Sequence, residues 1–453
     1  MSTVSSFYGL QTSLRGLLAQ QRALDVTSHN IANASTVGYS RQEATMAASV
    51  ALPIGPGALQ NGAGAQLGSG VDIQSYRRVR DGFLDVQFRA QATKLGEQQA
   101  RSEALDRAEM ALSEPGDSGI NTQLTEFWSA WSDLANAPDD VAARQAVIQK
   151  AGALADTFKT VDSQLALVAT QAADELTAQI GPQGDIANIA TELAQLNETI
   201  KGAVTAGQSP NDLLDRRDVL LDQLSALGTV SVQDEIGADG KATGAIDVRF
   251  GDPASPIELV SGREVTSFPL TLSGATGGRL GALREVSRPG GTVEGYRDAL
   301  DQVASSIAGS VNGAFTAAGL PPFFSTTPGS EAGSLSVAVD ASTLRTSASA
   351  DRGANDVALA VSRLVDGAGD STYRAFVSRI GSDAREATRA AANAEALTNA
   401  VGDRRESIAG VSLDEEMTNL VRFQRAYQAS ARAMSTMDEM LDVLINRTGR
   451  VGL

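Results

Sequence analysis

The stretch GVSLDEEMTNLVRFQRAYQASARAMSTMDEMLDVLIN (residues 410–446) decides the fold, because it predicts one long helix with a single apolar side. Ser412 is the expected N-cap, and the acids at 414–416 suit the positive end of the helix dipole. Residues in steps of three and four form a stripe with the repeat of a coiled coil. The stripe consists of Leu413, Glu416, Leu420, Phe423, Tyr427, Ser430, Met434, Met437, Leu441 and Leu444.

The opposite end of the chain carries a matching stripe, made of Phe7, Leu10, Leu14, Leu17, Gln21, Leu24, Ser28 and Ile31. A single helix cannot bury such a stripe by itself, so we expect the terminal helices to pair or to assemble with copies from other molecules. The repeat favours assembly between molecules, and an internal hairpin stays open as an alternative. The residues predicted to assemble are Phe7, Leu10, Leu14, Leu17, Leu24, Ile31, Leu420, Phe423, Tyr427, Met434, Leu441 and Leu444.

The chain between these ends is mostly helical in pattern. Apolar periodicity predicts helices at about 79–112, 120–134, 141–179, 186–200, 210–228, 292–318, 356–365 and 371–402. Gly207 should end one helix, with Ser209 as the N-cap of the next and Pro210 in its first turn. The glycine-rich residues 52–70 read as a loop, and VDIQSY (71–76) and SLSVAVD (334–340) read as short strands.

Residues 229–283 change in texture to short alternating segments between Gly, Pro and Asp turns, which predicts a small β insertion. The expected fold is therefore mainly α with a small inserted all-β domain, in which the terminal helices pair at one end of a long helical bundle or coiled-coil body. We predict a terminal coiled-coil assembly domain (1–40 plus 411–453), a helical body (41–228 plus 285–410) and the β domain (229–284).

Composition limits the function. The 453 residues carry a formal net charge of −17 and a pI near 4.6, which argues against nucleic acid and against anionic membrane surfaces. The chain has no cysteine, and no apolar run reaches the ~20 residues of a membrane span, so no membrane insertion is expected. The opening MSTVSSFYGL lacks the regions of a cleavable secretory signal, which indicates the cytoplasm or export by a different route.

No constellation of residues indicates catalysis, a cofactor or a metal. The chain's one histidine, His29, reads as a solvated or interface residue and not as part of a Ser-His-Asp triad. The acid pairs at 139–140 and 415–416 read as helix-start acids, because adjacent helical residues point in different directions. Trp128 and Trp131 read as core anchors. We predict that the protein is not an enzyme.

The segment after the first helix, Asn33-Ala-Ser-Thr36-Val-Gly38-Tyr39, carries a family resemblance. It resembles the N-x-x-T-x-G-Y signature of flagellar axial proteins, which include rod, hook and hook-associated proteins. Gly38 permits a backbone angle that other residues resist, and Asn33 and Thr36 are expected to hold a turn through side-chain-to-backbone hydrogen bonds.

Two longer stretches narrow the resemblance to the hook-associated protein 1 family. The phrase Leu413-Asp-Glu-Glu-Met-Thr-Asn-Leu420 is similar to the C-terminal helix of that family. PDDVAARQAVIQKAGALADTFKTVD and SPNDLLDRRDVLLDQLS are similar to its helical body, which rod and hook proteins lack.

The resemblance implies a structural subunit at the hook–filament junction that allows the filament to assemble. It implies export through the flagellar secretion channel, with an export chaperone and the export apparatus as partners. It also implies a ring of copies that contacts the hook protein on one side and a second junction protein, next to the filament, on the other. Another axial subunit, such as a rod or hook protein, is the first alternative, and a rod-associated cell-wall hydrolase is the second.

Overall fold

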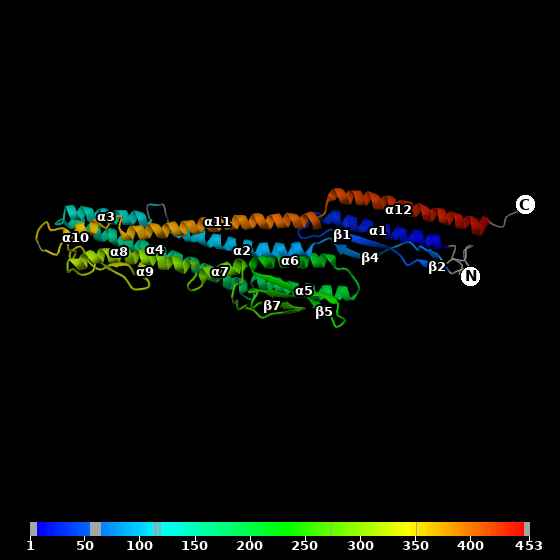
Figure 1. Cartoon of the computed structure of the whole chain (residues 1–453), viewed down its shortest axis with the longest axis horizontal. Helices are drawn as coiled ribbons and strands as arrows, with labels where there is room; N and C mark the ends of the chain where they lie inside the picture. The colour runs from blue at the N-terminus through cyan, green and yellow to red at the C-terminus, as the bar shows by residue number, and fades with distance from the viewer. Residues whose placement is uncertain are drawn as a thin grey trace, which may run out of the picture.

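The computed structural model describes residues 7–54, 65–112, 116, 119–272, 274–349 and 351–447. Long helices build a rod, and the first and last helices lie side by side at one end of it (Figure 1). The helices are α1 (Tyr8–Asn33), α2 (Gly82–Ala111), α3 (Ile120–Asn136), α4 (Val141–Ile180), α5 (Asp185–Thr205), α6 (Asn211–Leu227), α7 (Gly278–Ser287), α8 (Thr292–Ala317), α9 (Glu331–Ser334), α10 (Asp356–Ser362), α11 (Ala368–Ala409), α12 (Leu413–Asp442) and the π-helix η1 (Val443–Arg447).

The strands form small antiparallel sheets. They are β1 (Gln42–Ala48), β2 (Leu52–Ile54), β3 (Ala65–Leu67), β4 (Val71–Arg78), β5 (Val230–Ile236), β6 (Ala242–Phe250), β7 (Ile257–Ser261), β8 (Glu264–Val265), β9 (Phe324–Ser325) and β10 (Ser336–Val337). β1 pairs with β4, β2 with β3 and β9 with β10, while β5–β6–β7–β8 form a four-stranded meander. The predicted class, mainly α with a small β portion, is confirmed.

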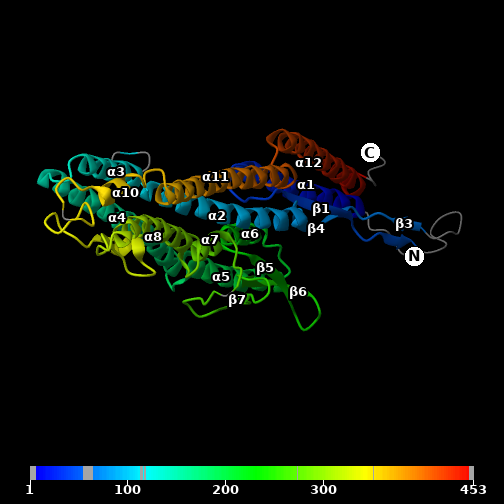
Figure 2. The same cartoon turned by 60° about the vertical axis from the view of Figure 1, so that its left-hand side comes forward.

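The body of the rod is a helical bundle. Helices α3, α4, α8 and α10 lie at the end far from the termini, and α2 and α11 run from there toward α1 and α12 (Figures 1 and 2). The core at the far end is aromatic: Trp131 is fully buried, and its ring centroid lies 5.3 Å from that of Phe323 and 6.4 Å from that of Phe127. The prediction that Trp128 and Trp131 anchor the core is confirmed.

The four-stranded sheet lies against the body. Its buried side chains, among them Val248, Phe250 and Leu259, belong to the same continuous hydrophobic core as the helices, and α5 packs on strands β6, β7 and β8. The strands end at Val265, so the expected β texture up to residue 283 is wrong. Residues 278–287 form α7, because Leu280, Leu283 and Val286 recur every third residue and pack inward.

The segment between α1 and α2 also differs from expectation. Residues 52–54 and 65–67, predicted as loop, pair as β2 and β3, while residues 55–64 lie outside the described residues. The predicted strand at 71–76 is confirmed as part of β4, but its partner β1 was missed. The ribbon of β1 and β4 lies along α1, although we assigned everything after residue 40 to the helical body (Figure 1). Pairing between strands so far apart in sequence leaves no local pattern to read.

Two helix-end predictions have different outcomes. Ser412 is the N-cap of α12, and its side chain accepts a hydrogen bond from the Glu415 backbone N–H, as predicted. Ser209 is not the N-cap of α6, because the helix begins one residue later and Pro210 occupies the cap position. Gly207 ends α5 with a φ of 73°, which is the left-handed region that favours glycine.

Candidate assembly interface

The turn after α1 is built from the residues of the family signature. The Asn33 side-chain amide donates to the His29 carbonyl at 3.0 Å, and the Thr36 backbone N–H donates to the Asn33 carbonyl at 2.9 Å. The Thr36 hydroxyl donates to Asn33 Oδ1 at 3.2 Å, so one of the two expected side-chain-to-backbone bonds joins two side chains instead. Gly38 has a φ of 79°, and a Cβ at this position would lie 2.1 Å from the Val219 Cγ2 of α6. Glycine is therefore required both by the backbone angle and by contact with the body.

Asn30, to which the sequence analysis assigned no role, holds four segments together: α1, the turn, β1 and α12. Its side-chain amide donates to the Gln42 carbonyl and to Glu416 Oε2, each at 3.0 Å. Its Oδ1 accepts from the Gln42 backbone N–H at 2.9 Å and from the Tyr39 hydroxyl at 2.8 Å. All four hydrogen bonds of this buried amide are thus made inside the protein.

Tyr39 is suited to its role as a donor. Burial raises the pKa of the Tyr39 phenol, and the carboxylates of Asp212, Asp215 and Glu416 raise that pKa further. The phenol therefore stays protonated at neutral pH and keeps its bond to Asn30.

Glu416 is the buried end of a clasp between α1 and α12. Its side chain is only 2% exposed, and Oε1 accepts from Arg41 Nε at 2.8 Å while Oε2 accepts from Asn30. Neighbouring Glu415 also pairs with Arg41, at 3.1 Å, but its side chain is 63% exposed. The Arg41 backbone N–H donates to the carbonyl of Ala409 at the end of α11. The prediction that the acids start the helix is confirmed, but it missed that Glu416 ties three segments together.

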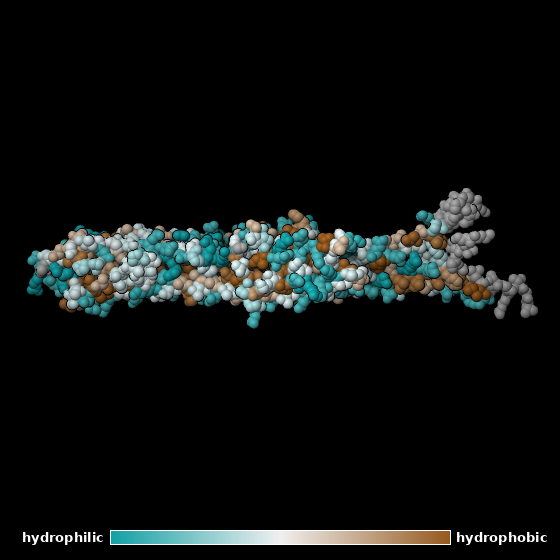
Figure 3. All heavy atoms as spheres, turned by 90° about the horizontal axis from the view of Figure 1, so that it is seen from below, coloured by the Kyte–Doolittle hydropathy of each residue, from teal (hydrophilic) through white to brown (hydrophobic). Residues whose placement is uncertain are grey.

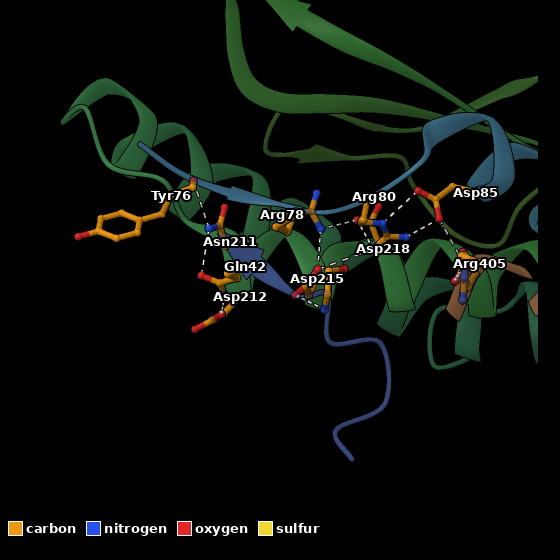
Figure 4. A network of polar contacts seen from close by, with 12 residues as sticks. Gln42, Tyr76, Arg78, Arg80, Asp85, Asn211, Asp212, Asp215, Asp218 and Arg405 are labelled. Carbon is orange, nitrogen blue, oxygen red and sulfur yellow. Dashed lines mark hydrogen bonds and ion pairs between the residues drawn. The ribbon is translucent and has the colours of Figure 1, made fainter. Parts of the chain in front are cut away.

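A network of charged side chains joins β4, α6 and α11 close to the turn (Figure 4). Asp215 Oδ2 accepts from the Ser40 backbone N–H at 3.0 Å, and its Oδ1 accepts from Arg78 at 2.7 Å. Asp218 pairs with three arginines from β4, the connection to α2, and α2 itself. The whole network consists of four arginines and four aspartates: Arg78, Arg80, Arg89 and Arg405 with Asp85, Asp215, Asp218 and Asp222.

Asp218 and Arg80 stay ionised because neighbouring opposite charges outweigh the effect of burial. Burial alone would raise the pKa of Asp218, but Arg80 and Arg78 outweigh that effect and hold the pKa below its usual range. At Arg80, burial opposes the charge, but the hydrogen bond to Asp85 and the nearby carboxylates raise the pKa above its ordinary value. A network of mutually paired ions rigidifies the place where the terminal helices meet the body.

Helices α1 and α12 pair in antiparallel fashion through small residues of α1. A Cβ on Gly9 would lie 2.8 Å from the Met437 side chain, and a Cβ on Gly16 would lie 3.3 Å from the Ser430 hydroxyl. Asn30 meets Glu416 farther along. The buried line of α1 consists of Ala19, Ala23, Thr27 and Asn30. The internal hairpin that the sequence left open is therefore present within one chain, and we call it the terminal hairpin (α1 and α12).

The predicted stripe of α1 lies away from this seam. Leu14 and Ala23 are nine residues apart, which places them on opposite sides of a helix with 3.6 residues per turn. Phe7 and Leu14 are 49% and 44% exposed, and Leu18 beside them is exposed as well. The remaining predicted positions, Leu10, Leu17, Leu24 and Ile31, are half-buried. Hydrophobic side chains are visible on the underside of this end of the rod (Figure 3).

The predicted stripe of α12 has a different position. Its members Glu416, Ser430 and Met437 contact α1, so the stripe faces the seam of the hairpin. Its apolar members Leu420, Phe423, Tyr427, Met434 and Leu441 are half-buried, Leu413 and Met437 are exposed, and the side chain of Leu444 lies outside the described residues. The structure thus separates two stripes that the sequence treated alike. The α12 stripe meets α1, whereas the α1 stripe lies on another face of its helix and is partly exposed.

His29, which the sequence analysis considered as a possible catalytic residue, contacts Asp212 of α6 and Tyr39 of the turn. His29 Nε2 lies 3.4 Å from Asp212 Oδ1, and its ring meets Tyr39 edge-on at 5.5 Å. Within the described residues, no three acidic or histidine side chains come together as a possible metal site. None of the helices in that part of the chain has both the length and the apolarity of a membrane span. A cleft of about 630 Å³ lies beside the turn, between residues 34–40 and the junction of α11 with α12.

Comparison with known proteins accounts for this arrangement. Residues 105–276 match the flagellar hook-associated protein FlgK helical domain. The flagellar hook-associated protein 1 of Bacillus subtilis (strain 168) is 31% identical over 505 residues, which cover 98% of this chain and 99% of the relative. The chain belongs to the flagellar hook-associated protein 1 family.

Other matches are consistent with this family. The hook-associated protein 1 of Escherichia coli (strain K12) is 31% identical over 57% of this chain and 45% of its own length. That of Salmonella typhimurium (strain LT2) is 34% identical over 49% of this chain and 39% of its own length.

The terminal hairpin matches models of flagellar rod proteins. Residues 10–39, which hold most of α1 and the turn, match the flagella basal body rod protein family, and residues 406–447 match the basal body rod FlgEFG protein C-terminal family. The chain is thus a structural subunit of the flagellum, with ends common to axial proteins and a helical body specific to hook-associated protein 1.

Proposed function

We propose that this protein forms the junction between the flagellar hook and the filament and allows the filament to assemble. Membership of the hook-associated protein 1 family over the whole length of the chain carries this proposal. The helical-domain match distinguishes it from a rod or hook protein, whose family models match only the two ends.

The terminal hairpin supports assembly of copies into a ring. Phe7 and Leu14 of its α1 stripe, with Leu18 beside them, are exposed, on a helix whose other faces contact α12 and the β1–β4 ribbon. Burying these side chains against a neighbouring copy would contribute roughly 1.5–3 kcal/mol for each large apolar side chain that becomes fully buried. We propose that the α1 stripe contacts neighbouring copies, while the α12 stripe shapes the hairpin.

The same family membership supports the partners and the route. We propose that the ring contacts the hook protein on one side and a second junction protein, next to the filament, on the other. Export would proceed through the flagellar secretion channel with an export chaperone. Within the chain, residues 1–40 with 411–453 act as the assembly domain, joined by the β1–β4 ribbon, and the helical body with its β insertion makes the remaining contacts. The role requires no catalysis and no cofactor.

Deletion of the gene tests the function. Cells that lack the protein should carry hooks without filaments, and filament subunits should accumulate in the medium. Electron micrographs of flagella, with immunoblots of the medium, measure both results. Complete filaments on the deletion strain would refute the junction role. Loss of the hooks as well would instead favour a rod or hook subunit.

A further inference from the structure

The terminal hairpin joins the body at an elbow where the helical path is broken. Helix α11 ends at Ala409 and α12 begins at Leu413, so only Gly410, Val411 and Ser412 connect two long helices. Gly410 has an extended backbone, and a Cβ there would lie 2.5 Å from the Glu406 carbonyl oxygen. The remaining connections are the turn at residues 34–41 and the short link between β4 and α2.

Charge pairs lie on both sides of this break, and further polar contacts span it. On the far side, Glu416 binds Arg41, whose backbone N–H reaches back to Ala409. On the near side, Arg405 of α11 binds Asp222 at 2.6 Å. Between the two sides, Ser40 binds Asp215, which leads through Arg78, Asp218 and Arg89 to Asp222. These contacts, joined by the Ser40–Arg41 peptide bond, therefore lead from α12, through the turn, β4, α6 and α2, to α11.

The elbow also has space for movement on one side. The cleft of about 630 Å³ is bordered by the turn residues 34–40, by Gly410 and Ser412, and by Arg405. On the body side, Phe88 of α2 and Val219 of α6 line the same cleft, and the side chain of Arg405 lies over the ring of Phe88 at 4.0 Å.

We infer that Gly410–Ser412 is a hinge, and that the chain of charged contacts across it, from Glu416 to Arg405, is a latch that holds the terminal hairpin at one angle to the body. Short connections beside a cleft allow more than one angle, whereas polar and charged contacts among six segments (α12, the turn, β4, α6, α2 and α11) hold one angle. The latch makes hairpin and body move together as one rod, and its loss leaves both folded but free to change their angle.

Distances between spin labels test this inference in the full chain. The protein has no cysteine, so labels attach only where cysteines are introduced, at exposed Ala90 of α2 and exposed Ala433 of α12. Ala433 lies about 30 Å along α12 from the hinge, given a rise of 1.5 Å per residue. A hinge rotation of roughly 20° therefore moves this label by about 10 Å, which pulsed electron spin resonance resolves.

The parent protein should show one narrow distance distribution. Asp215→Asn combined with Glu416→Gln should widen it at least twofold, with unchanged helix content by circular dichroism. Arg41→Gln, a single change that removes the cation at the centre of the clasp, should widen it as well. Glu175→Gln is the matched control, because it removes a carboxylate from a body ion pair with Arg279 at 2.6 Å. That control should leave the distribution narrow.

The inference is overturned by any of three results. The distribution could be as broad in the parent as in the latch variants, which would mean that nothing holds the angle. It could stay narrow in both Asp215→Asn/Glu416→Gln and Arg41→Gln, which would mean that packing alone sets the angle. It could widen equally in Glu175→Gln, which would mean that the loss of any ion pair loosens the rod.

Discussion

Replacing Glu416 by alanine should open the terminal hairpin far more than the same change at its neighbour Glu415. Both are acids of the first turn of α12, and both pair with Arg41. Loss of the helix-dipole interaction and gain of alanine's helix propensity are thus common to the two variants. They differ in burial, because the Glu416 side chain is 2% exposed and the Glu415 side chain 63%.

The expected magnitudes follow from that difference. Removing one partner of a buried, hydrogen-bonded ion pair costs about 3–5 kcal/mol. Arg41 keeps its bond to Glu415 when Glu416 is lost, so we expect the lower end of this range, about 3 kcal/mol, together with an unpaired amide hydrogen on buried Asn30. An exposed pair such as that of Glu415 is worth at most ~1 kcal/mol.

Hydrogen exchange of the amides in α1 near Asn30 and in the first turns of α12 measures this opening directly. With a factor of ten for each 1.4 kcal/mol, Glu416→Ala should speed exchange roughly 100-fold, and Glu415→Ala less than about fivefold. Amides in α4 and α8 should exchange as in the parent. Equal acceleration in the two variants, or none in Glu416→Ala, would show that the clasp does not hold the hairpin and that our account of it is mistaken.

Three further predictions concern assembly, the turn and acid. Leu14→Asp should leave the melting temperature of the monomer nearly unchanged, because Leu14 is 44% exposed, but deletion cells complemented with this variant should lack filaments. Cells complemented with the control Gln428→Asp, on the exposed surface of α12, should form filaments. Normal filaments with Leu14→Asp would exclude the α1 stripe from assembly. Gly38→Ala should destabilise the folded chain by more than ~1 kcal/mol in denaturant unfolding, because φ is positive and Val219 blocks the Cβ, and a neutral effect would contradict this. The pKa of Asp218 is lower in the folded than in the unfolded protein, so its stabilising contribution is complete above the unfolded pKa of about 3.9 and is lost as pH falls through the lower folded pKa. Below pH 4, the unfolding free energy should therefore fall more steeply with pH in the parent than in Asp218→Asn. Equal pH dependence of the two unfolding free energies would argue against the paired carboxylate.

Local features of this protein were predictable from its sequence. The long helices of the body, though not α7, follow from apolar periodicity, and Ser412 caps α12 as expected, because a cap depends only on residues within one turn. The positive φ of Gly38 was likewise implied by the turn signature, and the buried tryptophans by their type and spacing. In each case the information lies within a few residues of the feature.

Pairing between distant segments was decided only by the tertiary structure. The seam of α1 consists of glycine, alanine, threonine and asparagine, which carry little hydrophobic signal, while the leucines that suggested a seam lie on another face. Small residues let two helices approach closely, and that benefit exists only when the partner is in place.

The clasp and the latch show the same limit. Asn30 and Glu416 are 386 residues apart, and Ser40 and Asp215 are 175 apart. In the sequence, each of these residues looks like an ordinary helix-start or surface residue, because a charged or amide side chain is well solvated in water without any protein partner. The sequence alone determined the features that depend on periodicity and capping within single helices. Only the tertiary structure determined which polar side chains are buried, because burial of a charge is stable only where folding brings an opposite charge within hydrogen-bond distance.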